Sequence, residues 1–238
     1  MEIIRYKRHD DMDVEFLDDF HFVKEHATYS NFKRGEIKNP YDKILFGVGY
    51  LGFGKWKSRY DKKISDVYLS WMHMLERCYD PDQKEKYPAY YNKCTVSMVW
   101  HDFQNFADWY AQNKYDVGAE VLHLDKDIKY PKNTIYSPYS CILVPQRINE
   151  LFTCKPKENG LPVGISLSTS GKYVASYNGK HLGTYSELKD AYKIYAIAKE
   201  MAIQNVANDY KEIIPHEIYE ILMKYKVLIE NDKNYLSS

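Results

Sequence analysis

The chain has 238 residues, and its 33 basic and 33 acidic side chains leave a formal net charge of zero. Hydrophobic residues make up 45% of it, yet no apolar run approaches the roughly 20 residues that cross a bilayer. The N-terminus is charged and lacks the apolar core of a signal peptide. These features argue against a membrane or exported protein, so we expect a cytoplasmic protein with two or three small domains.

The cysteines Cys78, Cys94, Cys141 and Cys154 contain no C-x-x-C pair. This spacing indicates neither a zinc knuckle nor a disulfide framework, and it favours reduced thiols.

Residues 1–45 alternate short apolar stretches with acidic clusters, which predicts a small β-rich module. Residues 46–65 follow with four glycines and no G-x-x-x-x-G-K-[ST] phosphate loop, so we expect a flexible, basic linker. Within 51–63, five basic side chains face one acidic one, a net charge of +4. Affinity for phosphate depends on local charge. The candidate DNA contacts are therefore Lys55, Lys57, Arg59, Lys62 and Lys63.

Residues 66–112 have helical periodicity. Asp66 can cap a first helix, and a second is predicted around 102–110. The same periodicity favours core positions over base-stacking ones for Trp71, Trp100 and Trp109.

Residues 122–152 combine two apolar runs with polar groups at both ends. The first run ends in Asp125 and Asp127, a polar loop follows, and the second run spans 141–144. A helix is predicted to start at Pro145 and to carry Asn149. The order is therefore strand, loop, strand, helix.

This stretch resembles the ββα-metal (HNH) nuclease motif, in the variant common in bacteriophage genomes. The resemblance extends over about 66–152, through Trp71-x-x-Met74-x-x-Arg77-Cys78-Tyr79, Pro88-x-Tyr90 and Val99-Trp100-x-x-Phe103-x-x-Phe106. A further segment, Tyr29 to Pro40, resembles a short module that precedes phage HNH proteins.

The resemblance implies that Asp125 and Asn149 bind one divalent ion, Mg²⁺ or Mn²⁺. Lys126 stands where the family has its catalytic His, and a protonated amine is a poor base. His123 or Asp127 is the alternative for positioning the water. His123 lies three residues before Lys126, so a regular strand points the two to opposite faces. Arg147, on the same helix as Asn149, is a further candidate DNA contact.

Residues 161–205, after a predicted linker at 153–160, read as three strands and a helix, with turns at Ser170-Gly171 and Asn178-Gly179. They resemble the AP2 DNA-binding domain of phage and mobile-element endonucleases, through Gly164-Ile165, Lys172-Tyr173-x-Ala175, His181-Leu182-Gly183-x-Tyr185 and Ala191-Tyr192. That family reads the major groove with its sheet. The implied readers here are Ser166, Ser168, Lys172, Ser176 and Lys180, with few arginines among them.

Residues 206–238 predict one amphipathic helix that packs on the AP2-like unit or, alternatively, forms a homodimer contact. The expected fold class is α+β: a β-rich module, a helical segment with an HNH-like core, and an AP2-like sheet and helix. We expect residues 1–158 to fold without the remainder.

Three functions fit these patterns. The first is a phage-type, homing-endonuclease-like HNH enzyme that binds double-stranded DNA. The second is a DNA-binding protein on an inactive nuclease scaffold, which the lysine at position 126 favours. The third is a phage regulator or inhibitor that binds a host protein.

Overall fold

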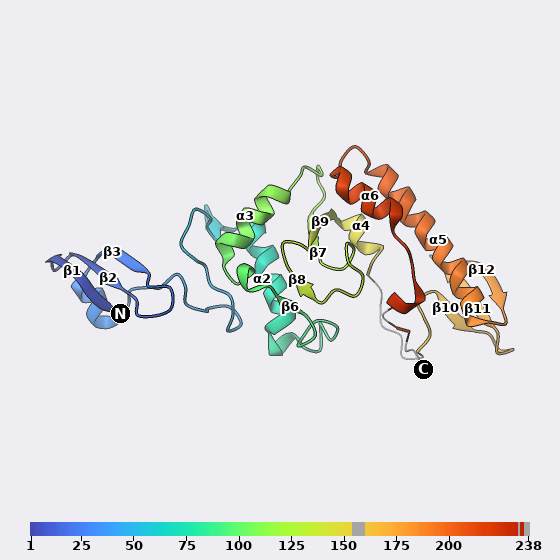
Figure 1. The fold of residues 1–238 in the computed structure, drawn as a ribbon, viewed down its shortest axis with the longest axis horizontal. Coiled ribbons are helices and arrows are strands. Elements are labelled where there is room, and N and C mark those ends of the chain that lie inside the picture. The colour runs from blue at the N-terminus through green and yellow to red at the C-terminus, as the bar shows by residue number, and fades with distance from the viewer. Residues whose placement is uncertain (154–159, 233, 236–238) are drawn as a thin grey trace. The chain divides into compact units, whose positions relative to one another are not determined.

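The computed structural model describes residues 1–153, 160–232 and 234–235, so most of the predicted 153–160 linker lies outside the described residues. The described chain is α+β, with several small sheets and six α-helices (Figure 1). It divides into two compact units. Unit 1 contains residues 1–112 and 135–137, and unit 2 contains 113–134 and 138–238. Within the described ranges, none of the helices combines the length and the apolar character needed to span a bilayer.

Unit 1 begins with the predicted β-rich module. Strands β1 (Glu2–Arg8), β2 (Asp11–Glu15) and β3 (Val23–Ala27) form an antiparallel sheet in that order, followed by helix α1 (Tyr29–Arg34). The sheet buries Met12, Val14 and Ala27. Its central strand also holds the largely buried Asp13 carboxylate, which pairs with Arg5 across the β1–β2 ladder.

The glycine-rich segment is packed and not flexible. The backbone of Tyr50 bonds to that of His101 and of Phe103, so the segment pairs with the start of the second helix. At Gly52 (φ +67°) an added Cβ would lie 2.2 Å from a carboxylate oxygen of Asp102, and at Gly49 it would lie 2.5 Å from Leu75. These glycines allow close approach to the helices. The expectation of a flexible linker is therefore wrong for residues 49–54.

The two predicted helices of unit 1 are present. Helix α2 (Asp66–Tyr79) is capped by Ser65, one residue earlier than expected, and α3 (Phe103–Asn113) follows the 3₁₀ turns η1 (Pro81–Gln83) and η2 (Met98–Trp100). Trp71 and Trp100 are buried, and the Trp71 indole donates to the Trp100 carbonyl at 2.7 Å. Trp109 packs edge-on against Trp100 at 4.7 Å between ring centroids. All three tryptophans are thus packing residues.

Two small ladders complete unit 1. Strands β4 (Arg59–Tyr60) and β5 (Lys63–Ile64) form a hairpin. Strand β6 (Thr95–Val96) pairs in parallel with β8 (Ile135–Tyr136), although β8 lies in the long loop between the two strands of the strand–loop–strand segment. Three residues of that loop therefore belong to unit 1.

Unit 2 contains the strand–strand–helix segment. Strands β7 (Leu122–Asp125) and β9 (Ile142–Pro145) form an antiparallel ribbon, and α4 (Gln146–Glu150) follows with Pro145 as its N-cap. The apolar side chains of this segment share one core with two C-terminal helices. That core consists of Ile128, Ile142, Val144, Ile148, Ile203, Ala207, Tyr210, Ile214, Ile218 and Leu222.

The predicted three-strand unit is also present. Strands β10 (Ile165–Leu167), β11 (Tyr173–Tyr177) and β12 (Lys180–Tyr185) form an antiparallel sheet that packs on α5 (Leu188–Asp209). Ile165 and Ala175 face Ala191 and Tyr195 of the helix.

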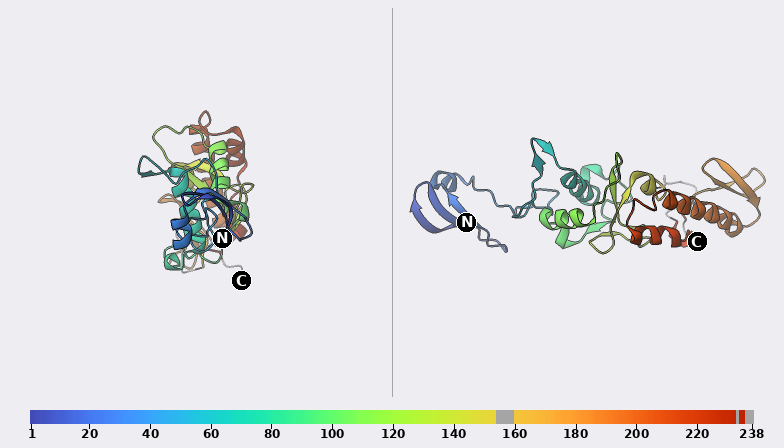
Figure 2. Two further views of the ribbon diagram at one scale, coloured as in Figure 1. Left: turned by 90° about the vertical axis from the view of Figure 1, so that its left-hand side faces the viewer. Right: turned by 90° about the horizontal axis from the view of Figure 1, so that it is seen from above.

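The tail is not one helix. Helix α5 continues to Asp209, the chain turns, and α6 (His216–Lys224) runs back beside α5, as both views show (Figures 1 and 2). A short turn, η3 (Ile229–Asn231), follows. Since α5 contributes both to the three-stranded sheet's core and to that of the β7–β9 ribbon, the predicted boundary near 153–160 does not separate two cores. The described units divide at 112/113 instead.

Candidate functional site

The β7–β9 ribbon places two polar side chains on the face that α4 covers. Opposed residues of an antiparallel pair project to the same face, and the register pairs Asp125 with Ile142 and His123 with Val144. Ile142 and Val144 pack with Ile148 of α4. His123 and Asp125 therefore project to this same face, two residues and roughly 6.6 Å apart along the strand. Leu122 and Leu124 project to the opposite face.

Asp125 uses only one of its carboxylate oxygens within the described structure. Its Oδ1 accepts hydrogen bonds from the backbone N–H groups of Asp127 (2.8 Å) and Ile128 (2.7 Å), which closes the turn after β7. The other oxygen, Oδ2, has no hydrogen-bond partner among the described residues. Burial, reinforced by the Asp127 carboxylate, raises the pKa of Asp125 from 3.8 to about 6. A cation beside Oδ2 would relieve this cost of burying a charge.

Two further polar side chains of the β7–β9–α4 segment make no hydrogen bond in the described structure. The His123 imidazole and the Asn149 side-chain amide are both half-buried, and neither makes a hydrogen bond to another described residue. Asn149 follows Ile148 on the helix that packs on the ribbon. The strand–strand–helix segment thus carries one carboxylate oxygen, one amide and one imidazole that make no hydrogen bond to a described residue.

This donor set fits an ion that retains water. Nowhere in the described ranges do three His, Cys, Asp or Glu side chains form a metal-binding group. A site with one carboxylate and one amide suits Mg²⁺, which keeps several waters and binds substrate phosphates. It does not suit zinc, which takes three or four protein ligands.

Lys126 lies in a loop network and not at this face. Its side chain is buried, and its ammonium donates to the Asn133 carbonyl (2.9 Å) and to Asp127 (3.2 Å). The Asn133 amide donates in return to the Lys126 carbonyl at 2.7 Å. These bonds hold the loop 126–133 in shape. This placement conflicts with the expected catalytic role of Lys126. The Asp127 carboxylate, the other candidate for positioning the water, is the ion-pair partner of Lys126.

Several predicted DNA contacts already have partners. The Arg147 guanidinium donates to Asp209 at 2.7 Å and lies 5.8 Å from the centre of the Tyr210 ring. Lys55 forms a 3.1 Å ion pair with Asp108. The other four basic residues of the patch, Lys57, Arg59, Lys62 and Lys63, are exposed and make no ion pair with a described residue.

The residues of the three-stranded sheet that are predicted to read DNA bases fall into an exposed group and a hydrogen-bonded group. Ser166, Lys172 and Lys180 are exposed, and no carboxylate of the described chain pairs with either lysine. The Ser168 hydroxyl accepts from the Lys172 backbone at 3.0 Å, and Ser176 donates to the Gly164 carbonyl at 3.4 Å. The hydroxyls of Ser168 and Ser176 are thus already hydrogen-bonded to the backbone of the sheet.

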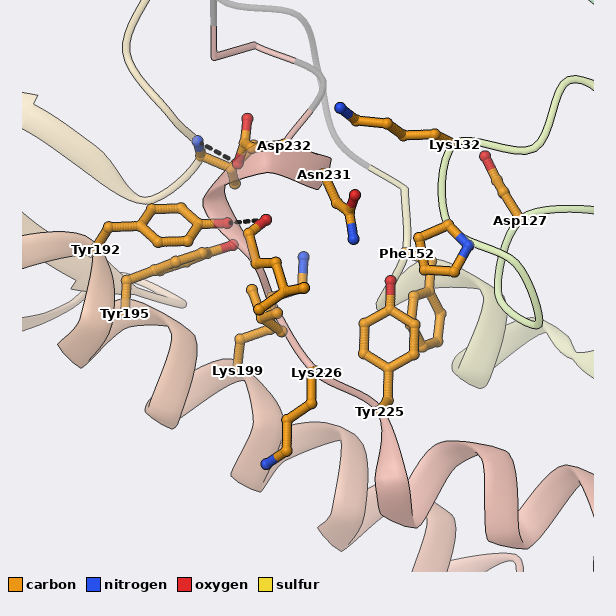
Figure 3. A pocket seen from close by; sticks show the side chains of 14 residues that line it. Asp127, Lys132, Phe152, Tyr192, Tyr195, Lys199, Tyr225, Lys226, Asn231 and Asp232 are labelled. Carbon is orange, nitrogen blue, oxygen red and sulfur yellow. Dashed lines mark hydrogen bonds between the residues drawn. The ribbon is translucent and has the colours of Figure 1, made fainter. Parts of the chain in front are cut away.

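A small pocket lies between α5 and the segment that follows α6 (Figure 3). There the Tyr192 hydroxyl donates to the Leu228 carbonyl at 3.3 Å, and Asp232 accepts from the Val163 backbone at 2.9 Å. Its volume is about 80 Å³, well below the roughly 300 Å³ at which small-molecule pockets begin. We regard it as a packing gap beneath the C-terminal segment.

Comparisons with protein-family models, with curated proteins and with solved structures found no match to this chain. The function proposed for this site therefore rests on its geometry. The spacing of three from Lys126 sets His123 apart from that residue, but the spacing of two from Asp125 places both side chains on one face of β7.

Proposed function

We propose that this chain is a DNA endonuclease of the HNH (ββα-metal) class, of the kind encoded by bacteriophages. In this proposal β7, β9 and α4 form the nuclease motif, and β10–β12 with α5 form an AP2-like DNA-binding module. One observation is the main support for the nuclease motif. Among the described residues, one oxygen of the partly buried Asp125 carboxylate, on the face that α4 covers, has no hydrogen-bond partner, and neither has the Asn149 amide of α4.

In this mechanism Asp125 Oδ2 and the Asn149 amide oxygen would hold one Mg²⁺ or Mn²⁺ ion. Held there, the ion would supply positive charge to stabilise the scissile phosphate and its leaving oxygen. His123 accepts the proton of the attacking water, because a neutral imidazole is the side chain best suited to do so near pH 7. Lys126 and Asn133 hold the turn that orients Asp125.

DNA binding is assigned to exposed cationic groups. Lys172 and Lys180 stand at the two turns of the three-stranded sheet, and Lys57, Arg59, Lys62 and Lys63 lie on unit 1. Phosphate contacts of this kind give an affinity that falls as salt rises.

The test is incubation of the full chain with supercoiled plasmid and Mg²⁺ or Mn²⁺, with EDTA as the control. Asp125→Ala and Asn149→Ala should each abolish metal-dependent nicking or cleavage. Asp116→Ala is the matched control, because Asp116 makes a similar turn bond, 2.9 Å to the Gly118 backbone, but is exposed. It should cut like the wild type.

The second candidate is a DNA-binding protein without nuclease activity. It is favoured by the lysine at position 126, where the resemblance calls for a histidine. Duplex binding without cleavage in either metal would establish this alternative and overturn the nuclease proposal.

A further inference from the structure

Unit 1 carries an exposed hairpin, here called the basic hairpin (residues 58–65). The register pairs Arg59 with Ile64 and Tyr60 with Lys63, and the Ser65 backbone closes the base by donating to the Ser58 carbonyl at 3.0 Å. Residues 59–64 are all exposed. Asp61 and Lys62 form the two-residue turn.

The turn of this hairpin has an unfavourable backbone conformation for its residues. Asp61 and Lys62 have φ values of +46° and +67°. Two-residue turns with both φ values positive favour Asn-Gly, because glycine carries no Cβ to clash. A lysine therefore occupies a position where glycine would be more stable. Strain of this kind is characteristic of functional positions.

The arginines of the chain point to the same hairpin. Arg5, Arg8, Arg34 and Arg147 are paired with acids. The Arg77 guanidinium lies 5.6 Å from the ring centres of both Tyr90 and Tyr136. Arg59 is exposed and pairs with no carboxylate of the described structure, and its charge partly offsets the rise that burial causes in the pKa of Tyr68.

The AP2-like sheet offers no substitute. Residues 148–238 contain no arginine. The commonest specific contact to a base is an arginine bonded to O6 and N7 of guanine in the major groove, and that groove admits a two-stranded β-ribbon.

We infer that the basic hairpin is the sequence-reading element of this protein, with Arg59 reading a guanine in the major groove and Lys62 contacting a phosphate at the tip. The inference rests on the proposed function only in requiring duplex DNA as the ligand. It assigns specificity to unit 1 and leaves general affinity to the lysines of the three-stranded sheet.

The first test determines the preferred duplex by selection from a library with a randomised centre, using the full chain. Wild-type protein should discriminate against replacement of one guanine by about 5- to 100-fold. Arg59→Lys keeps the charge but loses the rigid two-pronged donor geometry, so this discrimination should fall markedly while the salt dependence persists. A preferred site without guanine, or unchanged discrimination in Arg59→Lys, would overturn the inference.

A pair of tip variants tests Lys62. Lys62→Gly and Asp61→Gly both remove strain at adjacent residues but change the charge in opposite directions. Lys62→Gly should raise the melting temperature, weaken binding and lower the salt slope by about one. Asp61→Gly should also raise the melting temperature, with binding equal or tighter. Equal affinities and slopes in both variants would exclude the tip contact.

These outcomes separate two failures. A wild-type chain that binds no duplex at low salt would refute the proposed function as well. Persisting metal-dependent cleavage, together with guanine discrimination that survives Arg59→Lys, would refute the hairpin assignment alone.

Discussion

At the scale of the residue, Asp125 has two opposing effects. Its Oδ1 closes the turn after β7, and its burial raises the pKa to about 6. The folded state therefore binds a proton more tightly than the unfolded state, so stability is lost as the pH rises from about 4 through 6. The carboxylate that we propose as an ion ligand thus destabilises the protein in the absence of an ion.

Asp125→Asn should accordingly stabilise the protein in EDTA at pH 7.5, by about 2 kcal/mol. The amide oxygen keeps the turn bonds, and the buried charge is gone. At pH 4 the gain should nearly vanish, since the wild-type carboxyl is then protonated. Denaturant unfolding at both pH values measures this, with exposed Asp116→Asn as a control of no effect. Destabilisation at pH 7.5 would contradict the assigned burial cost.

His123→Gln should lower the cleavage rate about 10²–10⁴-fold while leaving DNA affinity and melting temperature nearly unchanged. The side chain has no hydrogen bond to lose in the described structure, so its removal acts on the chemistry. Single-turnover cleavage at saturating protein measures the effect. A wild-type rate would show that another group activates the water.

Lys126→His, which places the expected base in the motif, should instead destabilise the protein by about 1–3 kcal/mol and not increase cleavage. The imidazole cannot make both bonds of the ammonium, to the Asn133 carbonyl and to Asp127, so the loop should lose at least one hydrogen bond. Thermal unfolding and plasmid nicking are the measurements. Faster cleavage would restore a catalytic role to position 126.

At the scale of the element, local patterns predicted most strands and helices. The Asn178-Gly179 turn identified β11 and β12, and the apolar run at 141–144 identified β9. The sequence did not reveal what each element contacts. The close approach at Gly52 depends on Asp102, which is 50 residues away in the sequence, and the Lys126 network depends on how the loop returns to Asn133. The basic hairpin was missed because Asp61-Lys62 is not a usual turn pair.

Gly52→Ala should destabilise the protein by about 2–3 kcal/mol. The new methyl group would strain a positive φ and displace Asp102, whose Oδ1 accepts from the Gln104 backbone at the start of α3. Gly47→Ala is the matched control, with φ +74° but open space around its Cβ, and should cost about 1 kcal/mol. Equal losses by denaturant unfolding would mean that the segment does not pack as described.

At the scale of the whole molecule, the shared core changes the expectation for truncation. Residues 1–158 lack the side chains of α5, α6 and the turn between them that share the core of the β7–β9 ribbon: Ile203, Ala207, Tyr210, Ile214, Ile218 and Leu222. Burial of each isoleucine or leucine among them contributes roughly 1.5–3 kcal/mol, and a small domain cannot lose the sum of these contributions. The earlier expectation that 1–158 folds alone conflicts with this core.

A 1–158 fragment should therefore contain a folded unit 1 and an unfolded ribbon. Amide exchange should show protection in β1–β3, α2 and α3 and none in β7 and β9. The full chain, measured in parallel, should protect all of them. A protected ribbon in the fragment would show that the C-terminal helices are dispensable for it.

Because β8 belongs to unit 1, the two units become complete at different times during synthesis at the ribosome. Unit 1 is complete once residue 137 has emerged, but the helices that cover the ribbon end 87 residues later, at Lys224. At about 5–20 residues per second, the wait lasts roughly 4–17 seconds. During it, Ile142 and Val144 emerge from the exit tunnel before their covering helices exist, beside a loop already anchored by its β6 pairing. Nascent chains of this protein should therefore engage chaperones during that interval.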